Sequence, residues 1–335
     1  MATILKPYGS SNWEKEALKN IANVIGVVDV TGVSTGALTE DEIAEVIKSV
    51  DIFVADVDIT VTRQILGQGE KLKAVLCKSI GVDYVDINAA TEYGILVANN
   101  PDFCVTAVAE YTMALLLSIA RKIIPASLAV KRDEWGARTT MGGIELFGKT
   151  LGIIGLGRIG REVAAKAKAF GMEIIAYSPN AGPAVASTIG ARTVSLEELL
   201  QNSDVISIHT SLREETNKLI NAEKLKLVKK GAYLVNVARG GIVDEQALAD
   251  ALNSGRLAGA ALDVLTLEPP EKENPLLNTD NILITPHIGW FTAEAFEKAN
   301  RTLVEQVKSV LAGVEPPHVV NPEVIDRWKK RLSNF

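Results

Sequence analysis

The chain has 335 residues, of which 47% are hydrophobic and 23% are charged. This length suggests two domains, and the composition is close to that of globular proteins, which excludes a wholly disordered chain. Its 35 basic and 41 acidic residues give a formal net charge of −6 without a basic cluster, so we expect neither nucleic-acid binding nor attachment to an anionic membrane.

Short β-branched runs alternate with helical stretches along the chain, which is the pattern of parallel sheets covered by crossover helices. In the first hundred residues, amphipathic stretches at 40–48 and 61–66 are predicted to be helices. The predicted strands of this part are residues 24–28, 51–54, 73–76 and 95–97.

A long apolar helix is predicted at 105–121. Its most apolar part has 16 residues and contains Glu110, so we interpret it as a buried helix and not as a membrane span. The two cysteines, Cys77 and Cys104, have neither a disulfide-framework spacing nor a metal-ligand spacing, so we expect no metal site. The first residues lack the apolar core of a signal peptide, and we therefore expect a cytoplasmic protein.

A second series of strands begins at residue 150, and a long helix at 292–311 follows it. Six evenly spaced strands with helices between them suit a complete dinucleotide-binding sheet. The predicted strands are 150–154, 173–177, 205–209, 233–237, 259–263 and 282–285.

The first strand of this series leads into the sequence GLGRIG and then into a helix-forming stretch. In such a turn Gly155 permits the tight bend, Gly157 lets the backbone approach a pyrophosphate, and Gly160 lets the helix pack on the strand. The helix N-terminus offers N–H groups and the positive end of its dipole to the phosphates. Because strand, turn and helix occur in this order, the sequence predicts a dinucleotide site.

The residue at the end of the second strand, just after its last predicted position, discriminates between NAD and NADP in such a sheet. Here that residue is Ser178, which lies 18 positions after Gly160, where an aspartate would favour NAD. A serine neither repels nor neutralises a 2′-phosphate, so both cofactors stay open. We favour NAD because no cation adjoins Ser178 to hold the additional phosphate.

Three polar residues follow predicted strands of the second series, where ligands bind in open α/β sheets. His287 can exchange a proton near neutral pH, and a carboxylate at Glu268 would orient its ring and raise its pKa. The guanidinium of Arg239 suits a substrate carboxylate. Taken alone, Glu268 is a surface carboxylate and Arg239 a salt-bridging residue, but three such groups on one sheet favour a catalytic site. A second strand-end histidine, His209, is either a packed residue or a neighbour of the cofactor.

Four blocks of the sequence carry these residues: FGKTLGIIGLGRIGREVA, VNVARGGIVDEQALADAL, AGAALDV with a following EPP, and NILITPHIG. In sequence and in order they resemble the signature blocks of the D-isomer-specific 2-hydroxyacid dehydrogenases, most closely those of the D-3-phosphoglycerate dehydrogenases. The resemblance implies an NAD(P)-dependent enzyme that transfers a hydride between nicotinamide and a D-2-hydroxy acid or 2-oxo acid. 3-Phosphoglycerate, hydroxypyruvate and glyoxylate are the substrates that it suggests.

The resemblance also implies roles for individual residues. Arg239 would bind the substrate carboxylate and carbonyl, His287 would donate the proton, and Glu268 would pair with His287. Besides the three glycines, the implied cofactor contacts are Thr106, Arg158, Ile159, Ser178, Thr210, Val237, Ala238, Arg239, Asp263, His287 and Gly289. The implied substrate contacts are Lys78, Ser79, Ile80, Gly81, Arg239 and Trp290.

The family's fold implies two doubly wound parallel-sheet domains of the α/β class. A Rossmann cofactor domain at 100–290 would be inserted into a flavodoxin-like substrate domain made of residues 1–99 plus 291–335. The helix at 105–121 would support a homodimer, and the partners would otherwise be small 2-oxo or 2-hydroxy acids.

Two departures from the family pattern bear on the substrate. Cys77 stands where phosphoglycerate dehydrogenases carry an arginine, although the adjacent Lys78 can supply a positive charge. Trp290 is bulkier than the residue that often follows HIG and would narrow the pocket.

Two other classes of protein compete with this interpretation. A nucleotide-sensing corepressor of the same fold would bind the cofactor with little turnover, and some such proteins share the tryptophan at Trp290. The intact set of Arg239, Glu268 and His287 disfavours it. A relative of formate dehydrogenase is disfavoured by Glu268, which that branch typically lacks.

Overall fold

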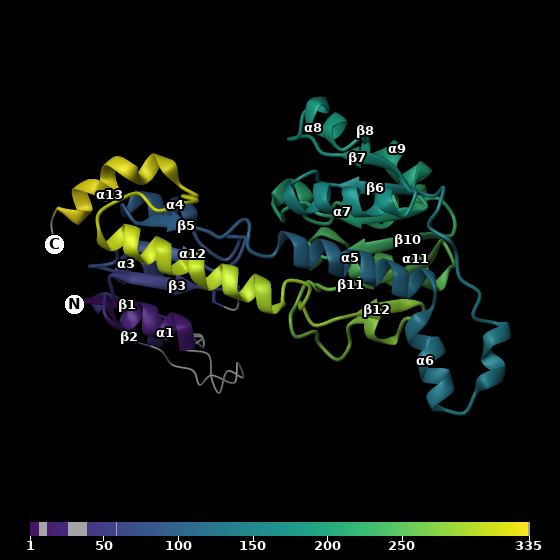
Figure 1. Cartoon of the computed structure of the whole chain (residues 1–335), viewed down its shortest axis with the longest axis horizontal. Coiled ribbons are helices and arrows are strands. Elements are labelled where there is room, and N and C mark those ends of the chain that lie inside the picture. The colour runs from purple at the N-terminus through teal and green to yellow at the C-terminus, as the bar shows by residue number, and fades with distance from the viewer. Residues whose placement is uncertain (7–11, 26–38, 58, 334–335) are drawn as a thin grey trace. The chain divides into compact units, whose positions relative to one another are not determined.

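The alternating strands and helices of the sequence form two separate parallel sheets. The computed structural model describes residues 1–6, 12–25, 39–57 and 59–333 and divides into two compact units (Figure 1). Unit 1 comprises Met1–Cys104 and Thr292–Phe335, and unit 2 comprises Val105–Phe291. The sequence analysis expects the chain to pass from the first domain to the second after residue 99 and to return after residue 290. In the structure these boundaries lie after residues 104 and 291.

Unit 1 contains a five-stranded parallel sheet with the order β2-β1-β3-β4-β5, which is the flavodoxin-like order. Its strands are β1 (Ala2–Leu5), β2 (Ala22–Ile25), β3 (Ile52–Ala55), β4 (Ala74–Cys77) and β5 (Leu96–Ala98). Its helices are α1 (Asn12–Lys19), α2 (Glu40–Val46), α3 (Arg63–Gln68), α4 (Ile87–Glu92), α12 (Ala293–Leu311) and α13 (Ile325–Leu332), with 3₁₀ turns at Ile47–Ser49 and Pro322–Val324.

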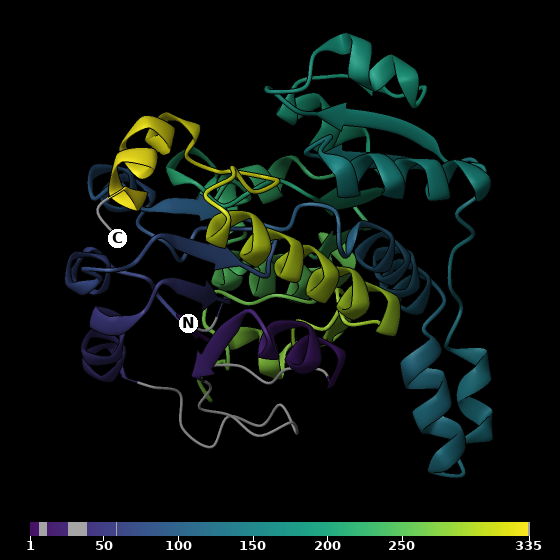
Figure 2. The ribbon, with the colours of Figure 1, turned by 60° about the vertical axis from the view of Figure 1, so that its left-hand side comes forward.

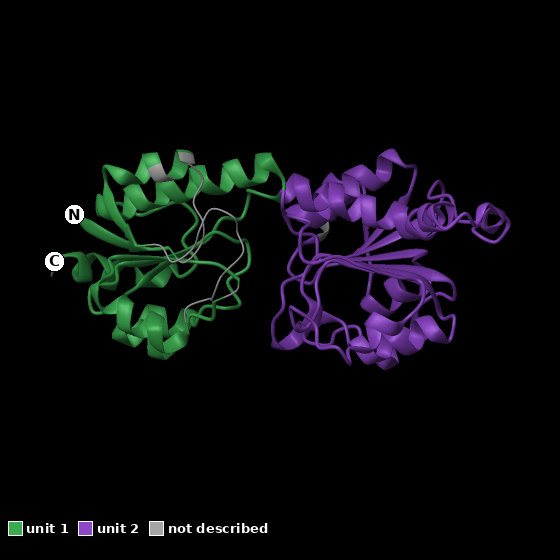
Figure 3. Cartoon of the chain, turned by 90° about the horizontal axis from the view of Figure 1, so that it is seen from below, with its two compact units in different colours: residues 1–104, 292–335 green, residues 105–291 purple. Residues whose placement is uncertain are grey.

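Both faces of the unit 1 sheet are buried, because successive strand residues point to opposite sides and helices cover each side (Figure 3). On one face, Phe53 and Val75 pack against α2, α3 and α4. On the other face, Ile52 and Leu76 pack against α1, α12 and α13, where Trp328 is fully buried. The strand ends therefore stay at the rim of the unit, where a site can form.

Unit 2 contains a seven-stranded parallel sheet with the order β12-β11-β10-β9-β6-β7-β8. Its strands are β6 (Thr150–Ile154), β7 (Glu173–Tyr177), β8 (Arg192–Thr193), β9 (Val205–Ile208), β10 (Ala232–Asn236), β11 (Leu257–Leu262) and β12 (Ile282–Ile284). Its helices are α5 (Val105–Ala120), α6 (Ile123–Lys131), α7 (Arg158–Ala169), α8 (Pro183–Thr188), α9 (Leu196–Asn202), α10 (Ala222–Leu227) and α11 (Glu245–Asn253). The 3₁₀ turns are Trp135–Thr139, Glu214–Thr216, Gly240–Ile242 and Pro275–Asn278.

The strand order of unit 2 is the Rossmann order with one further strand, β12. After β6 the chain first adds β7 and β8 on one side, and it then crosses to add β9 to β12 on the other. The topological switch point therefore lies between β6 and β9. Helices α5 and α7 cover one face of the sheet, and α9, α10 and α11 cover the other.

The long apolar helix predicted at 105–121 is α5, and it packs against α7, β10 and β11. The next helix, α6, extends away from the rest of unit 2 (Figure 2). Exposed apolar side chains on and beside it are Ile123, Ile124, Leu128, Val130 and Trp135. Within the described ranges no single helix is long and apolar enough to cross a membrane, and α5 and α6 meet that test only together, across a 61° bend.

The predicted fold class is confirmed, and most predicted strands agree with the structure to within two residues. The elements without a predicted counterpart include β1, β8, α1, α4, α6 and α13. β8 has two exposed residues at the sheet edge, too few to produce a pattern. α6 contains Pro125, a residue that disfavours the interior of a helix. Here the proline lies in the first turn, where a helix needs no N–H donor. The strand predicted at 24–28 begins earlier, as β2, and its last three predicted residues lie outside the described ones.

One side chain near the chain's end ties α13 to the rest of unit 1. The guanidinium of Arg331 donates hydrogen bonds of 2.5 to 3.0 Å to four backbone carbonyls, those of Gly69, Glu70, Leu72 and Tyr93. It thereby holds the loops before β4 and β5 against the helix whose Trp328 completes the core.

We expect Arg331→Ala to lower the free energy of unfolding by about 2 kcal/mol, because hydrogen bonds from a charged donor contribute roughly 1.5–3 kcal/mol. Denaturant titration of the whole chain measures this loss. The control is Arg327→Ala on the same helix, which removes a 3.3 Å hydrogen bond to the carbonyl of Thr91. Equal losses in the two variants would contradict the special role of Arg331.

Candidate active site

The site residues predicted in unit 2 gather at one edge of its sheet. All paired strands in the sheet are parallel, so their carboxyl ends meet at the same edge. Residues 155–160 follow β6, Ser178 follows β7, Thr210 follows β9, Val237, Ala238 and Arg239 follow β10, Asp263 and Glu268 follow β11, and His287, Gly289 and Trp290 follow β12. Thr106 lies in the first turn of α5.

The glycine turn has the shape that a dinucleotide requires. An ideal Cβ on Gly155, whose φ is +99°, would lie 2.7 Å from the backbone carbonyl of His209, and one on Gly160 would lie 2.1 Å from the carbonyl oxygen of Gly155. A Cβ on Gly157 would meet nothing within 4 Å. Gly157 is also the N-cap of α7 and lacks a capping side chain. Two glycines are thus required by close packing and the third faces open space at a helix N-terminus, which fits a pyrophosphate.

Ser178 takes part in the structure of this turn. Its Oγ accepts a hydrogen bond of 3.1 Å from the N–H of Leu156, and the N–H of Gly155 donates to the carbonyl of Tyr177 at 2.9 Å. The end of β7 is thereby fixed to the glycine turn. The Ser178 hydroxyl keeps its own hydrogen for a further acceptor, such as a ribose hydroxyl, and brings no charge to the site.

The loop that carries His287 is organised by the buried carboxylate of Asp263. This carboxylate accepts hydrogen bonds from the Thr285 hydroxyl at 2.6 Å, from the N–H of Ile288 at 3.0 Å and from the N–H of Gly289 at 2.8 Å. The N–H of His287 donates to the carbonyl of Asp263 at 2.8 Å. His287 has a φ of +55°, a region that few side-chain-bearing residues adopt. Asp263 therefore stabilises the loop conformation that presents the imidazole.

His287 and Glu268 form the central contact of the site. The imidazole Nδ1 lies 2.7 Å from Glu268 Oε2, and Glu268 Oε1 accepts a hydrogen bond of 2.9 Å from the N–H of Leu265. Partial burial alone would lower the pKa of His287, but the hydrogen bond and the negative charge of Glu268 outweigh it and raise that pKa. Partial burial would raise the pKa of Glu268, but its contacts with His287 and the charge of Arg239 lower it. The pair therefore favours imidazolium beside carboxylate.

Arg239 leaves β10 directly beside the loop that carries Glu268. The Asn236 side chain accepts from the N–H of Ala238 at 3.0 Å and donates to the carbonyl of Arg239 at 2.9 Å, which fixes the backbone after the strand. A Cβ on Gly240 would lie 1.9 Å from the carbonyl carbon of Leu265. Only glycine permits this contact, which brings the ends of β10 and β11 together.

The other strand-end histidine of unit 2 has a different environment. Burial lowers the pKa of His209 to about 3, so this ring is neutral at physiological pH. Its Nε2 lies 2.7 Å from the Ser207 hydroxyl, and its Nδ1 is buried without a hydrogen-bond partner among the described residues. His209 is thus a neutral, mostly packed histidine whose backbone borders the glycine turn, and its contact with the cofactor stays a prediction.

The residues predicted to contact substrate from unit 1 form the loop 78–81 after β4. The Ser79 hydroxyl hydrogen-bonds with the Tyr84 hydroxyl and the Gly81 carbonyl, each at 2.7 Å, and Ile80 is half-buried between them. These contacts give the loop a defined conformation. Its relation to the substrate stays a prediction.

Both basic and acidic residues lie at this edge of the unit 1 sheet, among them Asp56, which follows β3. Burial raises the pKa of the Cys77 thiol to about 12, so that residue carries no charge. Lys78 is buried with its ammonium 5.1 Å from the ring centroid of Phe296. Lys6, after β1, pairs with Glu14 at 2.8 Å with both side chains fully buried, and burial followed by the charge of Lys78 lowers the pKa of Lys6 to about 8.

Sequence reasoning missed several residues that shape the site in unit 2. Thr285 and Asn236 hold the backbone as described above, and Glu245 and Asn274 hold the loop that carries Glu268. All four follow or flank strand-end motifs that the sequence analysis singled out. Their position beside these motifs was the one feature of the sequence that pointed to them. Their hydrogen-bond partners could not be read from the sequence, because most of them lie in other segments of the chain.

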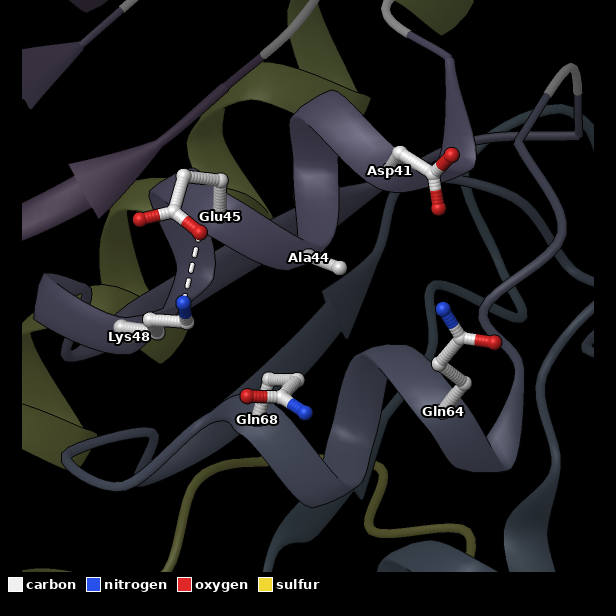
Figure 4. A pocket seen from close by; sticks show the side chains of 6 residues that line it. All are labelled: Asp41, Ala44, Glu45, Lys48, Gln64 and Gln68. Carbon is white, nitrogen blue, oxygen red and sulfur yellow. Dashed lines mark hydrogen bonds and ion pairs between the residues drawn. The ribbon is translucent and has the colours of Figure 1, made fainter.

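Unit 1 also has a surface pocket. It is formed between α2 and α3 (Figure 4) and is lined by Asp41, Ala44, Glu45, Lys48, Gln64 and Gln68. Lys48 is paired with Glu45 at 2.5 Å. Among the described residues no group of three or more His, Cys, Asp or Glu side chains is placed to hold a metal ion.

Comparison with known proteins identifies relatives along most of the chain. A D-3-phosphoglycerate dehydrogenase of Methanocaldococcus jannaschii is 46% identical over 316 residues, which are 94% of this chain and 59% of that protein. A hydroxypyruvate reductase of Thermotoga maritima is 42% identical over 82% of this chain and 89% of its own. The chain spans about half the length of most of the phosphoglycerate dehydrogenases that it matches.

A solved structure has the same fold. D-lactate dehydrogenase from Aquifex aeolicus, complexed with NAD and lactic acid, superposes with a TM-score of 0.84 at 30% identity and covers 96% of this chain and 99% of its own. The model for the NAD binding domain of D-isomer specific 2-hydroxyacid dehydrogenases matches residues 113–289. That match covers more than half of the chain and contains the glycine turn, Arg239, Glu268 and His287. On this sequence and this geometry, the chain belongs to the D-isomer specific 2-hydroxyacid dehydrogenases.

Proposed function

We propose that the protein is an NAD-dependent oxidoreductase that interconverts a D-2-hydroxy acid and its 2-oxo acid. The observation that carries this proposal is the 2.7 Å contact between His287 and Glu268, which lies on the same sheet edge as the glycine turn and Arg239. The names of the relatives reported above are those of dehydrogenases and reductases, and none of them supports the corepressor alternative.

Each group at the edge has a distinct task in this reaction. The dinucleotide supplies or accepts the hydride when it is bound. The guanidinium of Arg239 binds the substrate carboxylate and polarises the 2-oxo group. As negative charge develops on the carbonyl oxygen, protonated His287 donates its proton to that oxygen, and in the oxidative direction the neutral ring accepts it.

Glu268 keeps His287 ready for the reductive direction. Its carboxylate raises the pKa of the ring against the effects of burial and of Arg239, so a larger fraction of His287 is protonated near neutral pH. Its hydrogen bond to Nδ1 also leaves the other ring nitrogen, Nε2, to face the substrate. A neutral His209 cannot replace this donor.

The substrate and the assembly state are finer parts of the proposal. We propose that Lys78, Ser79, Ile80, Gly81 and Trp290 contact a small 2-oxo acid such as 3-phosphohydroxypyruvate, hydroxypyruvate or glyoxylate. The relatives named for phosphoglycerate and hydroxypyruvate support this range. We also propose a homodimer, for which the exposed apolar side chains of α6 offer a contact surface, and a cytoplasmic location.

The purified chain is expected to oxidise NADH with at least one of 3-phosphohydroxypyruvate, hydroxypyruvate, glyoxylate and pyruvate. We expect His287→Ala to lower kcat roughly 10²–10⁴-fold, because that is the typical contribution of a positioned proton donor. NADH binding, followed by fluorescence, should stay close to the wild-type value. His318→Ala serves as the control and should keep wild-type turnover. Turnover by His287→Ala at the wild-type rate would remove His287 from the mechanism.

The reduction should lose rate as the pH rises through the raised pKa of His287, because only the protonated ring donates. In Glu268→Gln the charge that raises this pKa is gone, while burial and Arg239 still lower it. The fall in kcat/KM should therefore move to lower pH, and a pH–rate profile measures the displacement. An unchanged profile in a folded Glu268→Gln protein would show that Glu268 does not control the proton donor.

We expect Ser178→Asp to raise the preference for NADH over NADPH by about tenfold or more, since a carboxylate binds ribose hydroxyls and repels a 2′-phosphate. The substituted side chain can still accept from the N–H of Leu156. Ser178→Ala is the matched control, because it removes that acceptor and should weaken both cofactors alike. Titration of each variant with NADH and NADPH gives the ratio of the two dissociation constants. An unchanged ratio in Ser178→Asp would show that residue 178 does not lie beside the 2′-position of the bound cofactor.

A further inference from the structure

The loop that carries Glu268 is attached to the start of α11 by another carboxylate. Glu245, the first residue of α11, accepts a hydrogen bond of 2.7 Å from the N–H of Thr266 on Oε1 and one of 2.7 Å from the side-chain amide of Asn274 on Oε2. Thr266 and Asn274 lie on either side of Glu268. The side chain of Glu245 therefore holds the segments before and after Glu268 in the loop 264–274, which we call the catalytic loop.

The amide of Asn274 has a single suitable orientation. Its Oδ1 accepts from the N–H of Leu276 at 3.0 Å and caps the following 3₁₀ turn, so its Nδ2 must be the atom that faces Glu245. The contact is therefore a donor on Asn274 meeting an acceptor on Glu245. An exchange of donor and acceptor between these positions is chemically possible without a change in size.

The attachment continues directly to Glu268. The N–H groups of two consecutive residues bind two carboxylates: Leu265 donates to Glu268 Oε1 at 2.9 Å and Thr266 donates to Glu245 Oε1 at 2.7 Å. The other side of this peptide contacts Gly240, where no Cβ fits. The peptide is thus held between the end of β10 and the two acids, and the Glu268 side chain has little freedom to turn away from His287.

We propose that Glu245 is a positioning residue for the reaction: it holds the loop so that Glu268 faces His287. This inference rests on the proposed function of the His287–Glu268 pair. Glu245 contacts neither of these two side chains in any hydrogen bond described above, so its effect must pass through the backbone of the loop.

Helix capping does not account for the contacts of Glu245. The N-cap of α11 is Asp244, whose Oδ1 accepts from the N–H of Ala247 at 3.1 Å and whose Oδ2 pairs with Lys218 at 3.1 Å. A second acid in the first turn adds a favourable interaction with the helix dipole. That interaction requires no particular partner, whereas both oxygens of Glu245 accept from the catalytic loop.

Three charged groups act on the protonation of His287, and only one of them lies on this loop. Glu268 and Asp263 favour the protonated ring and Arg239 disfavours it. The Asp263 carboxylate is held by the loop after β12, and the side chain of Asn236 fixes the backbone of Arg239, so none of these hydrogen bonds involves Glu245. Loosening the loop should therefore weaken the contribution of Glu268 and leave the other two in place.

The first test measures the protonation of His287 directly, by NMR titration of the histidine rings in the full chain. In Glu245→Gln the amide nitrogen would meet the Asn274 amide nitrogen, donor against donor. We expect the titration midpoint of His287 to fall by about one pH unit. The fall in kcat/KM with pH should move in the same direction, and kcat should fall severalfold while NADH affinity changes little.

The second test exchanges the two groups. Asn274→Asp alone places two carboxylates together and should impair the enzyme, whereas Glu245→Gln combined with Asn274→Asp restores one donor and one acceptor. The double variant should recover most of the His287 midpoint and of kcat. Failure of the double variant to recover, with both single variants folded and impaired, would overturn the assigned contact.

Asp244→Asn is the matched control for damage to α11. It keeps the capping oxygen but removes the pair with Lys218 and the negative charge at the helix N-terminus, and it should lower the temperature of unfolding without moving the His287 midpoint. The inference fails if Glu245→Gln leaves the midpoint unchanged, or if Asp244→Asn moves it equally. Because the midpoint requires no turnover, an inactive wild-type protein would contradict the proposed function and still leave this measurement decisive.

Discussion

The candidate active site depends on backbone segments that touch each other without a side chain between them. At Gly155 the glycine turn lies against the end of β9, and at Gly240 the chain after β10 lies against the peptide after Leu265. A Cβ at either position would overlap main-chain atoms that cannot move aside separately. These two contacts bring the cofactor turn, the guanidinium strand and the carboxylate loop to a common edge.

Buried and half-buried acids then fix the loops that leave this edge. Asp263 satisfies two N–H groups and a hydroxyl of the loop around His287, and Glu245 satisfies two donors of the loop around Glu268. Each carboxylate replaces water as the acceptor for loop groups that secondary structure leaves unpaired. The loops around His287 and Glu268 are therefore fixed by charge-assisted hydrogen bonds more than by apolar packing, which suits the polar site that we propose here.

Much of this arrangement could be predicted from the sequence because the strands are short buried runs with clear ends. The strands at 150–154 and 173–177 were predicted to the residue, and the polar residues that follow strands must lie at one edge once the sheet is parallel. β1 was missed because four residues at the start of the chain give no periodicity.

The contacts that fix the loops could not be predicted in the same way. Glu245 reaches Asn274 across 29 positions, and Asp263 reaches Gly289 across 26, through irregular segments whose course no local pattern determines. The local sequence predicts that a helix begins at Asp244 or Glu245. It does not determine which of the two acids caps that helix and which one accepts hydrogen bonds from a neighbouring loop.

The groups to which we assign proton transfer and substrate binding, and the residues that hold them, all belong to unit 2. Arg239, Glu268 and His287, with the acids that hold their loops, make the contacts described above within residues 105–291. The departures from the family pattern at Cys77 and Lys78 lie in unit 1, whose sheet has its own core and its own strand-end charges. The hydrogen bonds that set the pKa of His287 lie within unit 2 and include no residue of that loop.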